Sequence, residues 1–137
     1  APDEPPLLGL VSMMAQSILS GNTIVALASE TAPLPAITLA EALTTSDLPG
    51  GVVNLLTGKR SELAPWLASH MDVNGVLDAS GDSAVLETLQ EGVSDNLKRV
   101  SDHSLKKSEH WFSLDACSPY RILDSVEFKT AWHPVGM

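Results

Sequence analysis

The feature that most constrains the fold is a repeated alternation between short apolar runs and longer segments with helical spacing. Apolar residues at positions 7, 8, 10, 11, 14 and 18 show the three- and four-residue spacing of a largely buried helix. Gly21 follows, where it can take the left-handed conformation that ends many helices, and the β-branched run at 23–28 then indicates a buried strand. The alternation continues, so that we expect helices at 7–19, 33–45, 61–69 and 82–91 and strands at 23–28, 52–56, 73–78 and 97–100. Strands and helices that alternate at this spacing predict an α/β fold with a mostly parallel sheet and flanking helices.

The last third of the chain has a different pattern. Residues 101–109 are polar and basic, which predicts an excursion over the surface. Residues 120–135 alternate between apolar and polar side chains with a period near two, so we expect one or two extended strands that end at His133-Pro134. A terminal strand of this kind pairs at a sheet edge, either in its own domain or in a neighbouring subunit. The prediction is therefore a single domain over 1–137 with C-terminal edge strands.

Composition narrows the class of protein. The 137 residues are enough for one domain, and a hydrophobic content of 44% with 18% charged residues excludes a disordered tail. Eight Lys and Arg against seventeen Asp and Glu give a net charge of −9, which repels nucleic acid. No apolar run reaches the roughly 18 residues that a membrane span needs. We therefore expect neither nucleic acid nor a membrane as a partner.

Cysteine usage indicates the compartment. The single cysteine, Cys117, cannot form an internal disulfide, and no Cys/His pair has the spacing of zinc ligands. These features favour a cytoplasmic location and argue against a metal site. The chain begins at Ala1 without an initiator Met or a cleavable signal peptide, so we expect a trimmed terminus or a cut upstream of the domain.

Four ordered blocks resemble the cofactor domain of the aldehyde dehydrogenase superfamily. They are Gly21-Asn22-Thr23-Ile24-Val25 with Ser29-Glu30, Pro49-Gly50-Gly51-Val52-Val53-Asn54, His70-Met71-Asp72-Val73 and Asn96-Leu97-Lys98-Arg99-Val100. Together they cover about residues 5–100, and four blocks in order are far more specific than any one of them. The resemblance implies a Rossmann-like domain, in which 1–100 is the cofactor-domain-like part and 101–137 holds the surface excursion and the terminal strands.

The chain is most similar to the shortened second dehydrogenase unit of the two-unit members of the family. That unit, too, ends in a segment resembling Lys129-Thr130-Ala131-Trp132-His133-Pro134-Val135. In the family, the polypeptide at this end contributes strands that cross to a neighbouring subunit. The resemblance therefore implies a homo-oligomer, or association with a complete dehydrogenase unit.

Three residues are candidate cofactor contacts by this resemblance: Glu30, Ser29 and Gly81. Glu30 stands where the family binds the adenosine ribose with a Lys and a Glu just after the first strand, but the Lys position here is Leu27. A carboxylate alone can accept from two ribose hydroxyls, so Glu30 remains a candidate. The alternative is that Glu30 is an ordinary solvated residue at the entry to a helix.

The phosphate turn departs from the family pattern. Counted from His70, it reads Asp78-Ala79-Ser80-Gly81, so Ser80 replaces a glycine and Asp78 adds a negative charge beside the expected pyrophosphate. A one-residue slip restores Gly81 but leaves the acidic neighbour. We therefore expect no cofactor in the main interpretation, and NAD(P) only if the chain is a working cofactor domain.

No catalytic residue is predicted. The family carries its general base after the fourth block, where this chain has a polar run at 101–107 that includes His103. A His there could act as a base, but a lone His in such a run is far more often a surface residue. The long family segment that bears the nucleophilic Cys has no counterpart, and Cys117 is interpreted as an incidental thiol.

Two functions from different classes follow. The leading interpretation is a non-catalytic aldehyde dehydrogenase-like module, a pseudoenzyme that serves structure or oligomerisation. The alternative is the cofactor-binding portion of an NAD(P)-dependent aldehyde dehydrogenase, an oxidoreductase whose catalytic lobe lies elsewhere. An unrelated small-molecule-binding domain is a third class, because a fold does not determine a function.

Overall fold

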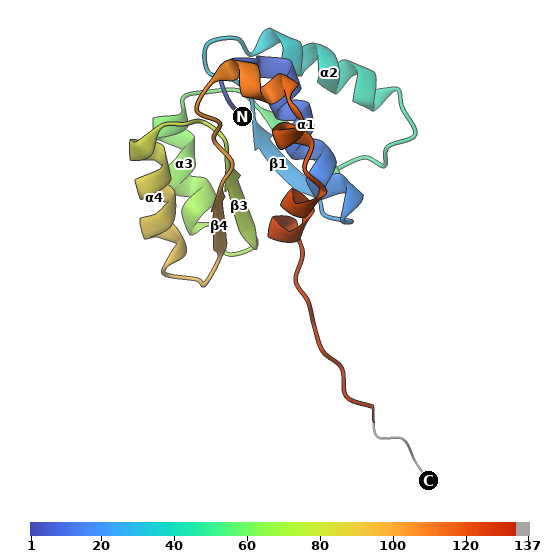
Figure 1. The fold of residues 1–137 in the computed structure, drawn as a ribbon, viewed down its shortest axis with the longest axis vertical. Coiled ribbons are helices and arrows are strands. Elements are labelled where there is room, and N and C mark those ends of the chain that lie inside the picture. Colours follow the sequence, from blue (N-terminus) through green and yellow to red (C-terminus); the bar gives the residue numbers. More distant parts are fainter. Residues whose placement is uncertain (134–137) are drawn as a thin grey trace.

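The structure is a computed structural model and describes residues 1–133, except for the side chain of Asp115. Within this range, helices and strands alternate in the predicted order (Figure 1). The helices are α1 (Pro6–Leu19), α2 (Leu34–Thr44), α3 (Arg60–Ser69) and α4 (Ser83–Val93). The strands are β1 (Ile24–Leu27), β2 (Val53–Leu56), β3 (Gly75–Asp78) and β4 (Arg99–Asp102). Each element overlaps its predicted range, so the α/β fold is confirmed.

The strands form two parallel pairs. Ile24 of β1 lies opposite Val53 of β2, and Gly75 of β3 lies opposite Arg99 of β4. The described residues contain no ladder between β1 and β3, and a cavity of about 350 Å³ lies there, with α1 side chains such as that of Met14 in its lining. The parallel pairing is as predicted. The structure differs from one continuous sheet only between β1 and β3, where the described residues form no ladder.

Local signals explain where the helices begin and end. Pro6 starts α1, where its missing N–H and fixed φ cost nothing. After α1, Gly21 takes a φ of +84° and its N–H donates to the carbonyl of Ile18 at 2.9 Å. The side chain of Asp82 caps α4 by accepting from the N–H of Ala84.

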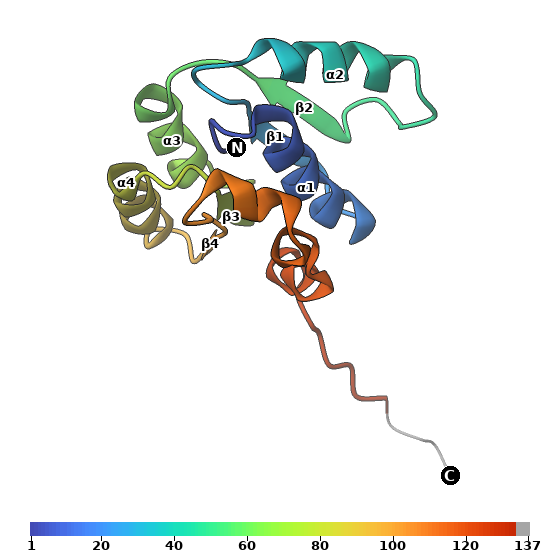
Figure 2. The same ribbon diagram turned by 45° about the horizontal axis from the view of Figure 1, so that its top comes forward.

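Separate clusters of buried apolar residues hold the helices on the two strand pairs. Leu10, Met14, Ala28 and Ala36 join α1 and α2 to β1–β2, and Ala64, Ala68, Val85 and Leu89 join α3 and α4 to β3–β4. Figure 2 shows α3 and α4 side by side along the second pair. A further cluster contains Met13, Ala79, Trp111 and Ala116 and connects α1 to the chain after β4. Burial of these side chains is the main source of stability.

The segment after β4 is more buried than expected. The predicted surface excursion at 101–109 is wrong at its start, because β4 continues to Asp102 and His103 is only 4% exposed. Short 3₁₀ helices follow: η1 (Ser108–Phe112), η2 (Leu114–Cys117) and η3 (Pro119–Ser125). Trp111 in η1 is 2% exposed, which explains why this part of the chain packs against the body.

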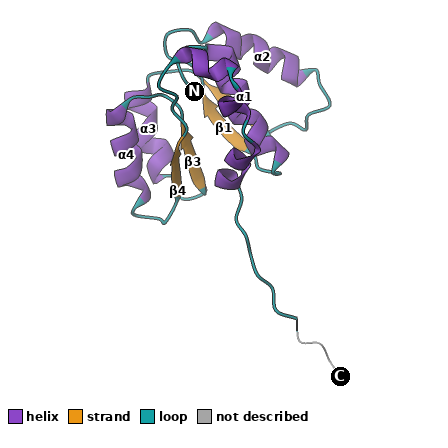
Figure 3. Cartoon of the chain, viewed as in Figure 1, coloured by secondary structure: helices purple, strands orange, loops and turns teal. Residues whose placement is uncertain are grey.

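The predicted C-terminal edge strands are absent from the described residues. Residues 119–125 form η3, which Pro119 begins with its fixed φ, and 126–133 then run out from the body without pairing to a strand (Figure 3). The hydroxyls of Ser20 and Ser125 lie 2.9 Å apart and fix η3 beside the end of α1. An alternating segment becomes a strand only where a neighbouring edge supplies hydrogen bonds, and 126–133 pair with no strand of the described part of the chain. The end of the predicted strand, at 134 and 135, lies outside the described residues.

Candidate functional site

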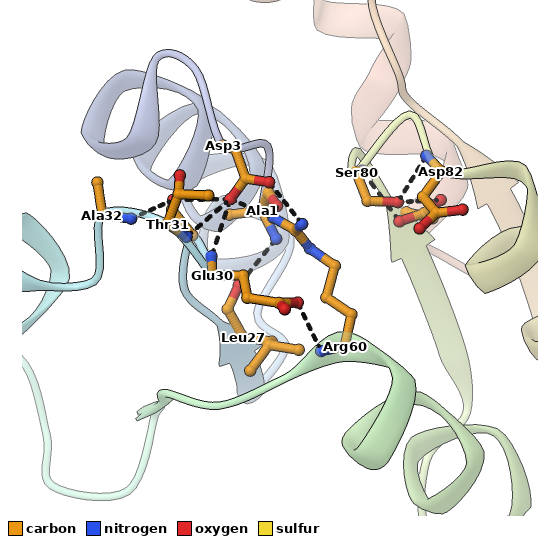
Figure 4. Close-up of polar contacts among 11 residues, drawn as sticks. Ala1, Asp3, Leu27, Glu30, Thr31, Ala32, Arg60, Ser80 and Asp82 are labelled. Atoms are coloured by element: carbon orange, nitrogen blue, oxygen red, sulfur yellow. Dashed lines mark hydrogen bonds and ion pairs between the residues drawn. The ribbon is translucent and has the colours of Figure 1, made fainter.

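The candidate site lies at the carboxyl edge, which is the side of the molecule where the parallel strands end. Ligands of open α/β sheets bind in this position. Ser29 and Glu30 follow β1, Arg60 follows β2, and Asp78 ends β3 with Ser80 close behind. The fold therefore gathers the turns that contain all three candidate cofactor contacts on one side, as Figure 4 shows for the first two turns and for Ser80.

In the turn after β1, the hydrogen-bond donors are already engaged by the carboxylate of Asp3. Its Oδ1 accepts from the hydroxyl of Ser29 at 2.8 Å, from the N–H of Glu30 at 2.8 Å and from the N–H of Thr31 at 3.3 Å (Figure 4). Ser29 is only 2% exposed, so this hydroxyl is held inside the fold. The predicted contact Ser29 is thus a partner of the chain's own acid in this structure.

Arg60 completes the surroundings of that carboxylate. Its Nη1 lies 2.7 Å from Asp3 Oδ2 and its Nη2 lies 2.8 Å from Oδ1, which is the bidentate geometry of a strong ion pair. Hydrogen bonding to Arg60, followed by that to Ser29, holds the pKa of Asp3 well below its usual range, although burial opposes the shift. The same pair raises the pKa of Arg60. We call the Ser29 hydroxyl, the N–H groups of Glu30 and Thr31 and the Arg60 guanidinium the Asp3 cradle.

Glu30 is exposed and has a structural contact. Its Oε2 accepts the backbone N–H of Arg60 at 3.0 Å, so the carboxylate caps the first turn of α3. This contact agrees with the alternative of a helix-entry residue, although the helix it caps is α3. The contact leaves the other oxygen of the carboxylate for a further partner, and the role in ribose binding stays a prediction.

In the turn after β3, too, a carboxylate of the chain accepts the available hydrogen-bond donors. The buried Asp78 accepts from the N–H of Ser80 at 3.0 Å and from its hydroxyl at 3.1 Å, and the Ser80 hydroxyl accepts in turn from the N–H of Asp82 at 3.2 Å. Gly81 has a φ of +73°, a conformation that favours glycine. Gly81 therefore has the backbone conformation of a tight turn, and its role as a cofactor contact stays a prediction. The carboxylate of Asp78 takes N–H and O–H donors that a phosphate would need.

His103 corrects one of the predictions. It was expected at the surface, but its ring is buried, with Nε2 2.7 Å from Oδ2 of Asp124. The backbone N–H of His103 donates to the carbonyl of Asp78 at 2.6 Å. The reason is that β4 continues past its predicted end and carries His103 beneath η3. Cys117 is exposed, and the described residues contain no group of three or more His, Cys, Asp or Glu that could hold a metal.

The sequence did not predict Asp3 and Arg60, whose bidentate ion pair joins the turns at the carboxyl edge. The available signal was positional: Arg60 comes two residues after Thr57-Gly58, at the end of a predicted strand, where ligand contacts are common. Asp3 carried no such signal, because its partners lie 26 to 57 residues further along the chain.

Comparisons with known proteins agree with this architecture. A model of the aldehyde dehydrogenase family matches residues 1–104. The chain is 31% identical over 125 residues to a mitochondrial aldehyde dehydrogenase of Leishmania tarentolae, covering 91% of this chain and 24% of that protein. It is 28% identical over 95 residues to a D-glyceraldehyde dehydrogenase (NADP(+)) of Picrophilus torridus, covering 69% and 19%. The crystal structure of an aldehyde dehydrogenase from Bartonella henselae matches with a TM-score of 0.70 and 30% identity, over 75% of this chain and 21% of that one.

The chain thus spans 24% or less of the length of these relatives. No helix among the described residues has the length and apolar character needed to cross a membrane. The family match covers most of the chain, and the solved structure shares its arrangement of helices and parallel strands. The chain belongs to the aldehyde dehydrogenase family.

Proposed function

We propose that this chain is a non-catalytic aldehyde dehydrogenase-like module that serves structure or oligomerisation. One observation carries the proposal: at the carboxyl edge, the carboxylates of Asp3 and Asp78 already accept the donors of the turns after β1 and β3. A pyrophosphate carries negative charge of its own, so it would meet repulsion from two acids as well as occupied donors. The residues present do not fit a dinucleotide in this arrangement.

The residues that chemistry requires give further support. Aldehyde oxidation in the family needs a thiolate nucleophile and a carboxylate base close to the substrate. The single thiol of the chain, Cys117, lies in η2, and His103, near the expected base position, is buried against Asp124. The buried ring of His103 is therefore not open to a substrate as a base would be, and we propose that Cys117 is an incidental thiol.

Assay of the chain with a panel of aldehydes and NAD or NADP tests the proposal. We expect no increase in the absorbance of the reduced cofactor above background. Cys117→Ala is the matched control, because it removes the single thiol from an exposed position. Turnover that the variant abolishes contradicts the proposal and assigns Cys117 as the nucleophile.

The second candidate is the cofactor-binding portion of an NAD(P)-dependent aldehyde dehydrogenase. It is supported by the left-handed Gly81 in the turn after β3 and by Glu30 after β1. Under the first proposal we expect weak NAD binding, because Leu27 stands at the family's Lys position and Asp78 and Ser80 alter the phosphate turn. Losing a charged hydrogen bond costs about 1.5 to 3 kcal/mol, so two such losses lower the affinity for NAD about a hundredfold or more. Titration calorimetry separates the candidates: saturable binding at low micromolar NAD favours the cofactor domain.

Assembly and location complete the proposal. The described tail at 126–133 bears exposed aromatic side chains, which supports a homo-oligomer or association with a complete dehydrogenase unit through this segment. The single cysteine supports a cytoplasmic location. We further propose that the chain is one dehydrogenase-like domain, with 1–100 as the cofactor-domain-like part.

A further inference from the structure

We propose that Asn74 is a site of covalent modification, at which the side-chain amide reacts with the backbone nitrogen of Gly75 and is converted to aspartate and isoaspartate. Asn74 lies just before β3 and Gly75 begins it, and both residues are exposed. Glycine has no Cβ beside the attacking nitrogen, so an Asn followed by Gly is the pair that hinders this ring closure least. The inference goes beyond the proposed function and does not depend on it, since the reaction needs only water.

The Asn74 side chain is unrestrained, in contrast to the other asparagine side chains. Within the described residues, no hydrogen bond holds its amide. The three other asparagines of the chain each donate their amide to a backbone carbonyl, at 2.7, 2.9 and 3.4 Å for Asn22, Asn54 and Asn96. The amide of Asn74 can therefore turn toward the backbone of Gly75 without breaking a contact.

The backbone N–H of Gly75 points away from β4. The carbonyl of Asn74 accepts from the N–H of Arg99 at 3.4 Å, and Gly75 lies opposite Arg99 in the ladder. Successive residues of a strand direct their backbone groups to alternate edges, so the Gly75 N–H faces the cavity between β1 and β3, which both Asn74 and Gly75 line. No ladder engages that edge of β3 in the described part of the chain. The attacking nitrogen thus lies outside the strand pairing.

The reaction balances with water as its single co-reactant. The Gly75 nitrogen loses its proton and bonds to Cγ of Asn74, while the Cγ–Nδ2 bond breaks and ammonia leaves. Water then opens the five-membered imide: attack at Cγ gives aspartate with the normal backbone, and attack at the backbone carbonyl gives isoaspartate, in which the backbone runs through Cβ and Cγ. Isoaspartate displaces the carbonyl that accepts from Arg99, so its formation removes the first contact between β3 and β4.

The test incubates the full chain at physiological pH and temperature and locates modified residues by peptide mapping with mass spectrometry. Loss of ammonia and gain of water should add about 1 Da at position 74. The modified chain should also become a substrate for isoaspartyl methyltransferase. Because each of the other asparagines precedes a larger residue, modification at Asn74 should be at least about tenfold faster than at Asn22, Asn54 or Asn96.

Gly75→Ala is the matched variant. Its added Cβ would lie 3.7 Å from the carbonyl oxygen of Arg99, which is an ordinary contact, and Gly75 has no positive φ, so the variant should keep the fold. It should slow modification of Asn74 at least about tenfold by crowding the attacking nitrogen. An undiminished rate in this variant overturns the proposal, as does modification of Asn74 no faster than that of Asn54.

The same chain unfolded in urea shows whether the fold leaves Asn74 reactive. Modification of the folded chain should proceed within about tenfold of the unfolded rate, and a stronger slowing means that the fold protects Asn74, which overturns the proposal. If circular dichroism shows that Gly75→Ala does not fold, Asn74→Gln takes its place, because its amide lies one carbon farther from the Gly75 nitrogen. An undiminished rate at position 74 in that variant refutes the site.

Discussion

A single carboxylate links three parts of the chain that are distant in sequence. Asp3 contacts the turn after β1 through Ser29 and the start of α3 through Arg60. Hydrogen bonds to ionised groups are stronger than neutral ones, and here both partners lie in partly buried surroundings. The pair therefore contributes to the stability of the carboxyl edge as well as to its electrostatics.

The first prediction concerns the pH dependence of that stability. Asp3→Asn should lower the free energy of unfolding by about 1 kcal/mol at pH 7, less than a fully buried charged pair because the Asp3 side chain is 33% exposed. The pKa of Asp3 is lowered in the folded state, so its contribution is complete above the unfolded pKa of about 3.9 and is lost progressively as the pH falls from there toward the much lower folded-state pKa. Urea unfolding from pH 7 to pH 2.5 measures the difference.

The expected result is a gap between the two proteins that is constant near neutral pH and narrows in acid. Asp47→Asn, which changes an exposed loop carboxylate, should show almost no gap at any pH. A gap for Asp3→Asn that persists unchanged at pH 2.5 contradicts the assignment, because Asp3 is then protonated in the unfolded chain and unfolding takes up a proton that the folded state does not hold.

At the same scale, the sequence predicted residues with local roles and missed those with distant partners. Gly21 was identified as a helix end, because a positive φ is a local requirement. The contacts of Asp3 and the burial of His103 depend on which distant turns the fold brings together, and residue spacing in the sequence does not predict such long-range contacts. His103 was misplaced because its polar neighbours suggested exposure, whereas Asp124, 21 residues further on, satisfies its ring.

At the scale of elements, helices and parallel strands were predictable because each carries its own signal. Apolar spacing, β-branched runs and turn residues are all local, and they identified α1 to α4 and β1 to β4 in order. The lack of a ladder between β1 and β3 among the described residues could not be predicted in the same way, since the apolar character of a strand does not say which other strand it pairs with. The C-terminal pattern failed for a related reason: a strand needs a partner edge, and η3 formed instead.

The second prediction concerns the contact between α3 and α4. A Cβ added at Gly92 in α4 would lie 2.5 Å from the Cβ of Ala68 in α3, which is closer than two such atoms can approach. Gly92→Ala gains up to about 1 kcal/mol of helix propensity, but overpacking costs about 1 to 3 kcal/mol. We expect a net loss of stability of about 1 kcal/mol in thermal or urea unfolding.

A matched glycine provides the control. A Cβ at Gly50, in the loop before β2, would meet no atom within 4 Å, so Gly50→Ala should change stability by less than about 0.5 kcal/mol. If Gly92→Ala is instead as stable as the unmodified chain or more stable, α3 and α4 can move apart freely and the close crossing is not a constraint on the fold.

At the scale of the whole molecule, acidic charge and apolar surface act in opposite directions on assembly. A net charge of −9 causes copies of the chain to repel one another. The described tail nevertheless exposes Phe128 at 83% and Trp132 at 91%, which is a large apolar area to leave in water. Both proposed partners, a second copy and a complete dehydrogenase unit, would cover this area.

The third prediction is that the tail carries the assembly. Deletion of residues 127–137 should convert an oligomer to a monomer in light scattering while circular dichroism stays unchanged. The cut after Val126 keeps the contacts of η3 with the body, among them the hydrogen bonds of Ser125 with Ser20 and Asn22 and of Asp124 with His103. Loss of mass therefore reports on the tail itself and not on unfolding of η3.

Point variants separate the role of the aromatic side chains from that of the backbone. Phe128→Ser with Trp132→Ser should weaken association at least tenfold, and raising the salt concentration should strengthen association of the unmodified chain by screening its negative charge. Trp66→Ser is the matched control, since Trp66 is 73% exposed on α3, far along the chain from the tail. If the tail variants keep the oligomeric mass while Trp66→Ser reduces it, the interface lies on α3. If the unmodified chain is already monomeric at every concentration, self-association through the tail is excluded, and the exposed aromatic side chains are left for a complete dehydrogenase unit to cover.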